Sequence, residues 1–187
     1  MKMTMRLSDN DIMRVGARRR NTIRTDTDFG FGLPIGRIPG TNLKVAYTGR
    51  LDMDIATARK VIDRIFESPN PSITIEFQGG EPLLNFDIIR FIIEEATKKN
   101  KKAKKNLLFA LVSNLTSLTL GQYDYLVKQK VSICTSLDGP AKLHNKHRVF
   151  LAHANSHQKT IMWLKKFKRS FDNKTFPHHV NALATVT

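Results

Sequence analysis

From about Thr41 onward, short apolar runs alternate with segments in which apolar residues recur at helical spacing. Apolar residues at positions i, i+3, i+4 and i+7 are typical of an amphipathic helix, and short β-branched or aromatic runs are typical of strands. Strands that alternate with helices favour βα units around a parallel sheet. The pattern therefore predicts an α/β protein with about four βα units.

Each helical segment is expected to face the core with one apolar stripe. Asp54 is a candidate N-cap for the first helix and Thr119 for the third, because short polar side chains accept hydrogen bonds from the first helical turn. In chain order, the stripe residues are Ile55, Ala58, Ile62 and Ile65; Ile88, Ile89, Ile92, Ile93 and Ala96; Tyr123, Leu126 and Val127; and Ile161, Leu164 and Phe167 or Phe171.

Polar turn sequences follow several of the expected strands. The strands are expected at residues 42–47, 73–77, 107–112, 131–137 and about 180–186. The turns QGGEP, SNLT and SLDGP come directly after the second, third and fourth of them. Because the carboxyl ends of parallel strands meet at one edge of a sheet, where α/β proteins bind ligands, we expect these turns to converge there.

The first of these turns carries Gly79, Gly80 and Glu81. Glycines allow a positive φ and close approach to the backbone, while a glutamate offers an acceptor for an ammonium or hydroxyl group. An ordinary glycine-containing turn with a surface glutamate is the alternative interpretation.

The next two turns offer Asn114, Ser136 and Asp138. An amide, a hydroxyl and a carboxylate at strand ends can contact a ligand, and they can equally satisfy the backbone of their own turns. Both interpretations stay open for these residues.

Basic residues and histidines form two further groups. Lys98 to Lys105 is a charged run between a helix and a strand, which indicates either phosphate binding or a solvated helix end. A His- and Lys-rich loop is expected before the last helix. In it, His153 and His157 have a spacing that suits a metal on one helix face, but no third ligand accompanies them, so no metal site is expected.

Residues 1–40 lack a sustained helical or strand period and contain Arg18-Arg19-Arg20 and a Gly/Pro-punctuated stretch. They are predicted to be a basic tail, and residues 41–187 the folded domain.

Length, charge and cysteine content limit the classes of protein to which this chain can belong. A chain of 187 residues suits one main domain, and a net charge of +15 favours a polyanionic or acidic partner. No apolar run approaches the roughly 20 residues of a membrane-spanning helix, and no secretory pattern is present, so a cytoplasmic location is expected. The one cysteine, Cys134, excludes an internal disulfide and a multi-cysteine metal site supplied by this chain alone.

Taken in order, the strings ITIEFQGGEPLLNF, LVSNLTSLT and SICTSLDGPAKLHNKHR resemble radical S-adenosylmethionine (SAM) enzymes of the SPASM peptide-maturase type. Within that group, the His-Xaa-Ser system maturases and the anaerobic sulfatase-maturating enzymes are similar. The resemblance covers about Gly49 to Thr187. It implies a partial (β/α) barrel with SAM over the strand ends, and a ribosomally made peptide or a partner maturase as the binding partner.

The resemblance also implies roles for single residues. The segment from Gly79 to Glu81 would receive the methionyl ammonium of SAM. Asn114, Ser136 and Asp138 would lie near its ribose or methionyl part, and Arg148 would face its carboxylate.

One departure from the family is severe. The family holds a 4Fe-4S cluster with three thiolates of a CxxxCxxC loop after the first strand, whereas this sequence has no cysteine before Cys134. We therefore expect a truncated or rearranged relative that is inactive on its own. A SAM- or peptide-binding module without catalysis is the alternative, and a basic nucleic-acid-binding protein ranks below it because no aromatic stacking platform accompanies the charge.

Overall fold

The computed structural model describes residues 52–79, 81–148 and 155–184 with their side chains, and the backbone of residues 2–8, 11–15, 35–37 and 44–46. The described helices are α1 (Ile55–Phe66), the 3-10 helix η1 (Pro82–Asn85), α2 (Phe86–Ala103), α3 (Leu120–Lys128), α4 (Ala141–His147) and α5 (Ser156–Asp172). The described strands are β1 (Lys2–Ser8), β2 (Asp11–Val15), β3 (Ile35–Arg37), β4 (Lys44–Ala46), β5 (Ser72–Gln78), β6 (Asn106–Ser113), β7 (Ser132–Ser136) and β8 (Asn181–Leu183). None of the described helices is long and apolar enough to cross a membrane.

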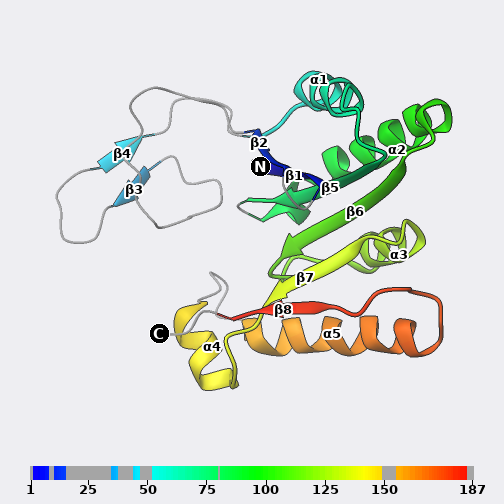
Figure 1. Cartoon of the computed structure of the whole chain (residues 1–187). Helices are drawn as coiled ribbons and strands as arrows, with labels where there is room; N and C mark the ends of the chain where they lie inside the picture. The colour runs from blue at the N-terminus through cyan, green and yellow to red at the C-terminus, as the bar shows by residue number, and fades with distance from the viewer. Residues whose placement is uncertain are drawn as a thin grey trace.

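Six of the described strands form one sheet in the order β2-β1-β5-β6-β7-β8. Strands β5, β6, β7 and β8 are parallel to one another, and helices connect them (Figure 1). Strand β1 lies antiparallel against β5, and β2 lies antiparallel against β1. The parallel part confirms the predicted α/β fold.

The core lies between the sheet and the helices α1, α2, α3 and α5, which cover one face of it (Figure 1). Alternate strand residues such as Ile75, Leu111 and Ile133 are fully buried against these helices. Complete burial of an aliphatic side chain of this size stabilises the fold by about 1.5–3 kcal/mol. The opposite face of the sheet is more open, since Leu108 is 48% and Leu183 55% exposed there.

The predicted helix starts and stripes are largely confirmed. Asp54 accepts a hydrogen bond from the N–H of Thr57 at 2.8 Å, and Thr119 forms a reciprocal capping box with Gln122. The expected stripes of α1 and α2 are buried except for Ile55, which is 54% exposed at the first position of its helix.

Helix α5 differs from the prediction in which face it buries. It begins at Ser156, earlier than expected, and its buried residues are Ser156, Thr160, Trp163 and Phe167. Of the expected stripe, Ile161, Leu164 and Phe171 are only half-buried. The wide Trp163 ring packs beside Tyr123, with ring centroids 5.6 Å apart, and this contact sets the face that turns inward.

Two segments predicted as connections are helical. The charged run does not separate helix from strand, because α2 continues through it to Ala103 and ends at Lys104 with a left-handed φ of 52°. Lysine and alanine are good helix formers, and cations near a helix C-terminus interact favourably with its dipole. The first part of the predicted His- and Lys-rich loop likewise forms α4, anchored by the buried His144.

The N-terminal region also differs from its prediction. Residues 1–40 contain β1, β2 and β3, and the signal that predicts β1 is the strict alternation of polar and apolar residues over Lys2–Ser8. The strand expected at 42–47 is shortened to β4, which pairs with β3 in a separate two-stranded sheet. Strand β1 occupies the edge of β5 that a further parallel strand would need. The domain division at residue 40 stays a prediction.

Candidate functional site at the carboxyl edge of the sheet

Glu81 joins the turn after β5 to the end of β6. It is only 7% exposed, and its Oε1 accepts the hydroxyl proton of Ser113 at 2.6 Å and the N–H of Leu83 at 3.2 Å. Its Oε2 accepts the N–H of Asn114 at 3.0 Å. Burial raises the pKa of the Glu81 carboxyl above its usual value, and the three hydrogen bonds partly offset the rise. This is not the surface glutamate of an ordinary turn.

The glycines before Glu81 form the turn itself. Gly79 has a φ of 112°, a conformation that side chains with a Cβ rarely adopt, so glycine is required at this position. Gly80 lies outside the described residues.

Asp138 and Arg148 form the second polar contact of the edge, after β7. The Asp138 side chain is 2% exposed and the Arg148 side chain 31%. Nε of Arg148 donates to Oδ2 of Asp138 at 2.5 Å and Nη2 donates to Oδ1 at 3.1 Å. The pair is bidentate, which is the strongest geometry for a guanidinium and a carboxylate. The structure thus brings two of the predicted site residues into direct contact with each other.

His144 supports the turn that carries Asp138. Its Nδ1 accepts the backbone N–H of Asp138 at 3.3 Å, so this nitrogen carries no proton. Burial lowers the pKa of the His144 imidazole, and the nearby Arg148 lowers it further, whereas Asp138 raises it. A neutral imidazole therefore fits the contact at neutral pH.

The first turns of α5 connect the Glu81 contacts at the end of β6 with the Asp138–Arg148 pair. The hydroxyl of Thr160 lies 3.1 Å from the carbonyl oxygen of Asn114 and donates to it, sharing its proton with the carbonyl of Ser156. One turn earlier, the hydroxyl of Ser156 lies 2.8 Å from the carbonyl oxygen of Arg148. The ends of β6 and α4 are thus both tied to α5.

Ser136, the last residue of β7, shares a strand face with Cys134, because side chains alternate along a strand. Both are half-buried, on the face opposite the helices. Burial raises the pKa of the Cys134 thiol, and the nearby Glu76 raises it further, so the thiol is protonated at neutral pH.

Sequence reasoning found Glu81, Asn114 and Asp138 but missed the side chains that hold them. Ser113 and Thr160 are the clearest cases. Ser113 occupies a strand position in phase with the buried Leu111, so its burial follows from the alternation. Thr160 lies on the inward face of α5, which begins four residues earlier than the apolar spacing predicts, so no comparable pattern indicates its burial.

Nothing in the described part of the chain brings three His, Cys, Asp or Glu side chains together as metal ligands. Of the histidine pair with metal-ligand spacing, His153 lies outside the described residues. The ring of His157 instead packs edge-on against His144, with centroids 5.5 Å apart.

Comparison with known proteins identifies relatives of this α/β domain, although no family model matches the chain. Over 85 residues, the chain is 33% identical to the radical SAM cyclopropyl synthase TigE of Paramaledivibacter caminithermalis, covering 46% of this chain and 17% of that protein. Over 140 residues it is 24% identical to the cysteine-type anaerobic sulfatase-maturating enzyme of Clostridium novyi, covering 70% of this chain and 37% of that enzyme.

Solved structures agree with the sequence relatives on the fold. Native anSMEcpe with bound AdoMet, which is SAM, has a TM-score of 0.61 at 23% identity, over 71% of this chain and 35% of that one. The same protein with AdoMet and the Cp18Cys peptide has a TM-score of 0.62 at the same identity and coverage.

The fold is therefore the partial α/β barrel that the sequence predicted, with a polar site at its carboxyl edge. The chain is similar in sequence to radical SAM enzymes over part of its length, which confirms the resemblance drawn from the three motif strings. It spans less than two fifths of the length of each of these relatives.

Proposed function

We propose that this chain binds SAM at the carboxyl edge of β5, β6 and β7. The observation that carries the proposal is the set of buried, mutually fixed polar residues at this edge. Glu81 is tied to β6, Asp138 is tied to Arg148, and α5 holds both groups. The likeness to solved structures with bound AdoMet supports the choice of ligand.

The chemistry of these residues suits SAM. A carboxylate has about four lone-pair sites, and the Glu81 hydrogen bonds occupy three, which leaves capacity to accept from an ammonium group. The bidentate pair uses two of the five N–H donors of Arg148, so the same guanidinium can also donate to a ligand carboxylate. When bound, SAM supplies a sulfonium centre that activates its attached carbons. Ser136 and Asn114 would contact the ribose or methionyl part.

An iron–sulfur cluster does not fit the residues of this chain. A 4Fe-4S cluster in this family needs three thiolates, and the chain has one cysteine, Cys134, whose thiol is protonated. These residues supply no electron to SAM, and we propose that this chain by itself holds SAM without reductive cleavage. In this proposal the chain shares its fold and its ligand with radical SAM enzymes, but its residues do not carry out their reaction.

A peptide is the partner that the open face of the sheet favours. Leu183 is 55% exposed there and pairs with the half-buried Ser136, whereas Leu108, 48% exposed, lies nearer the opposite end of the same face. Such a face offers apolar contact area next to the SAM edge. The anSMEcpe structures with bound peptides support this class of partner.

Titration calorimetry of SAM into the full chain tests the proposal, with thermal unfolding as a second measurement. Any ligand that binds only the folded state stabilises it, by about 2.7 kcal/mol at a concentration of 100 Kd. We expect a saturable heat and a higher melting temperature. Ser136→Ala should weaken binding without lowering the melting temperature, and Lys146→Ala, on the exposed face of α4, serves as the matched control.

Two outcomes contradict the proposal. A cooperatively folded protein whose melting temperature and calorimetric trace do not respond to millimolar SAM does not have the site. Formation of 5′-deoxyadenosine by the purified chain, supplied with iron, sulfide and a reductant, contradicts the absence of reductive cleavage while leaving SAM binding intact.

A further inference from the structure

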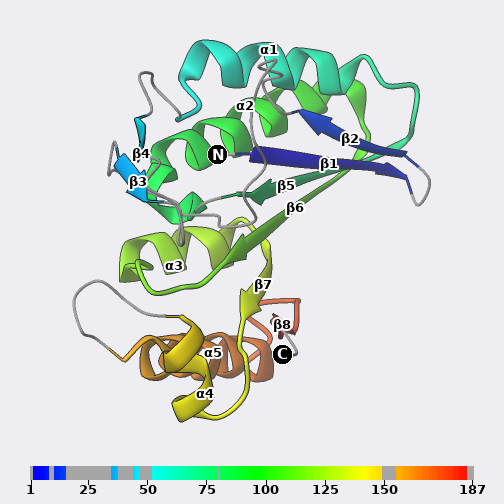
Figure 2. The ribbon, with the colours of Figure 1, turned by 90° about the vertical axis from the view of Figure 1, so that its left-hand side faces the viewer.

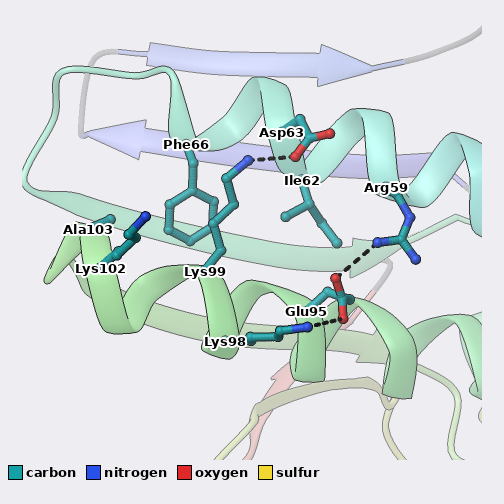
Figure 3. A pocket seen from close by; sticks show the side chains of 9 residues that line it. All are labelled: Arg59, Ile62, Asp63, Phe66, Glu95, Lys98, Lys99, Lys102 and Ala103. Atoms are coloured by element: carbon teal, nitrogen blue, oxygen red, sulfur yellow. Dashed lines mark hydrogen bonds and ion pairs between the residues drawn. The ribbon is translucent and has the colours of Figure 1, made fainter.

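A groove runs between α1 and α2 on the outer, helical side of the sheet (Figure 3). Its volume is about 790 Å³, within the range of sites that bind side chains or small ligands. Its apolar surface comes from the half-buried Phe66 of α1 and the exposed Ala103 at the end of α2, and the buried Ile62 lies at its base. None of the SAM-site residues lines it, so it is a separate feature of the molecule.

The walls of the groove are strongly cationic. Arg59 projects from α1, and Lys98, Lys99 and Lys102 project from α2 (Figure 3). Lys102 is exposed, as is the side chain of Lys98, at 78%. Cations held in a concave, partly apolar surface raise the local concentration of anionic partners.

Carboxylates in the same walls limit what those partners can be. Asp63 lies 2.5 Å from Lys99, and Glu95 lies 3.1 Å from Arg59 and 3.9 Å from Lys98. These two carboxylates among the cations repel a continuous phosphate backbone, whereas the side chains of a peptide can be spaced to avoid them. The Lys99 ammonium also lies 5.8 Å from the Phe66 ring centroid, which places charge directly beside apolar area.

We propose that the α1–α2 groove binds an acidic, amphipathic peptide segment of a partner protein. Its apolar side chains lie on Phe66 and Ala103, and its carboxylates lie against Lys98 and Lys102. This is the general mode in which an amphipathic segment places an apolar face in a groove and charges at its rim. The inference is independent of SAM binding.

Fluorescence anisotropy with a labelled synthetic peptide tests the proposal on the full chain. The probe is a helical 14-residue peptide with Glu on one face and Phe and Leu on the other, used at about physiological salt. The double variant Lys98→Glu/Lys102→Glu should weaken its binding about tenfold or more, because like charges then oppose the peptide. The matched control, Lys165→Glu/Arg169→Glu, makes the same charge change on exposed positions of α5 and should change affinity less than about twofold.

A second variant distinguishes binding in the groove from nonspecific attraction to the positive charge of the protein. Ala103→Trp fills the apolar part at an exposed position and should abolish binding while leaving the melting temperature unchanged. A probe with Ala in place of Phe and Leu should bind much more weakly. The proposal is overturned if the peptide does not bind, if both charge reversals weaken it equally, or if a single-stranded oligonucleotide or anionic vesicles compete for the groove more tightly than the peptide.

Discussion

The carboxyl edge of the sheet and the outer groove each contain a carboxylate and a cation whose closest atoms lie 2.5 Å apart. In Asp138–Arg148 the side chains are 2% and 31% exposed, whereas in Asp63–Lys99 they are 59% and 39% exposed. Water screens the second pair and largely replaces its hydrogen bonds, but it reaches little of the first. The distance between the charged atoms therefore does not tell which pair contributes more to stability. The buried Asp138–Arg148 pair is expected to contribute more than the exposed Asp63–Lys99 pair.

The largest effect is expected from Arg148→Ala. The variant leaves the buried Asp138 carboxylate without its bidentate cation, and removing one partner of a buried pair costs about 3 kcal/mol. Urea unfolding measures the loss, with Lys146→Ala on the preceding helix α4 as the control. A loss below about 1 kcal/mol would show that the buried pair behaves like a surface pair, and the contrast between the two regions would fail.

The next largest loss of stability is expected at Glu81. Its carboxylate accepts hydrogen bonds from the N–H of Leu83, the hydroxyl of Ser113 and the N–H of Asn114. Glu81→Ala should cost about 2 kcal/mol, since the buried N–H group of Leu83 and the partly buried N–H group of Asn114 lose their acceptor. Glu81→Gln should fold, and it removes the titration at this position.

The pH dependence of Glu81 follows from the direction of its pKa shift. The pKa is raised on folding, so the folded state binds the proton more tightly, and the stability this adds is fully present below the unfolded pKa of about 4.3. It is lost as the pH rises through the folded pKa. The cost of Glu81→Gln should therefore be largest near pH 4 and shrink towards pH 7, as measured by unfolding at a series of pH values. A cost that grows with pH would mean that hydrogen bonding outweighs burial at this carboxyl.

The positions of the candidate residues could be predicted from the sequence because they follow from strand ends. Glu81, Asn114 and Asp138 each come within three residues of the end of a strand, and parallel strands bring such positions to one edge. Their partners could not be predicted, because a contact such as that between Thr160 and Asn114 depends on how α5 packs across the sheet. The same limit applies to Arg148: the resemblance to the family implies that it lies near SAM, and only the structure shows that it is paired with Asp138.

The N-terminal strands were missed for a different reason. The alternation over Lys2–Ser8 is short, and the Gly/Pro-punctuated stretch that follows it is typical of a tail or linker. The edge of β5 is filled by a strand from the beginning of the chain, a long-range pairing that no local pattern indicates.

The change from threonine to valine, made separately at Thr160 and Thr135, shows how much a hydrogen-bond partner of the hydroxyl contributes to stability. Thr160→Val removes the donor to the Asn114 carbonyl and should cost about 1 kcal/mol. Thr135 is fully buried in β7, and its hydroxyl has no hydrogen-bond partner in the part of the chain that the structure describes. Thr135→Val should therefore stabilise the protein by about 1 kcal/mol. Chemical denaturation of both variants measures the difference, and the same sign for both would contradict the network.

The smallest effect is expected in the outer groove, from Asp63→Asn. It removes the partner of Lys99, but both side chains are well exposed, so the free energy of unfolding should change by less than about 0.5 kcal/mol. The same substitution should strengthen binding of the acidic peptide, because one of the two carboxylates in the groove walls is removed and Lys99 becomes available to the ligand. Unfolding and anisotropy on the same variant separate the two effects. A loss of stability as large as that of Arg148→Ala would mean that the groove pair holds α1 against α2, which would make it a structural contact and not a binding surface.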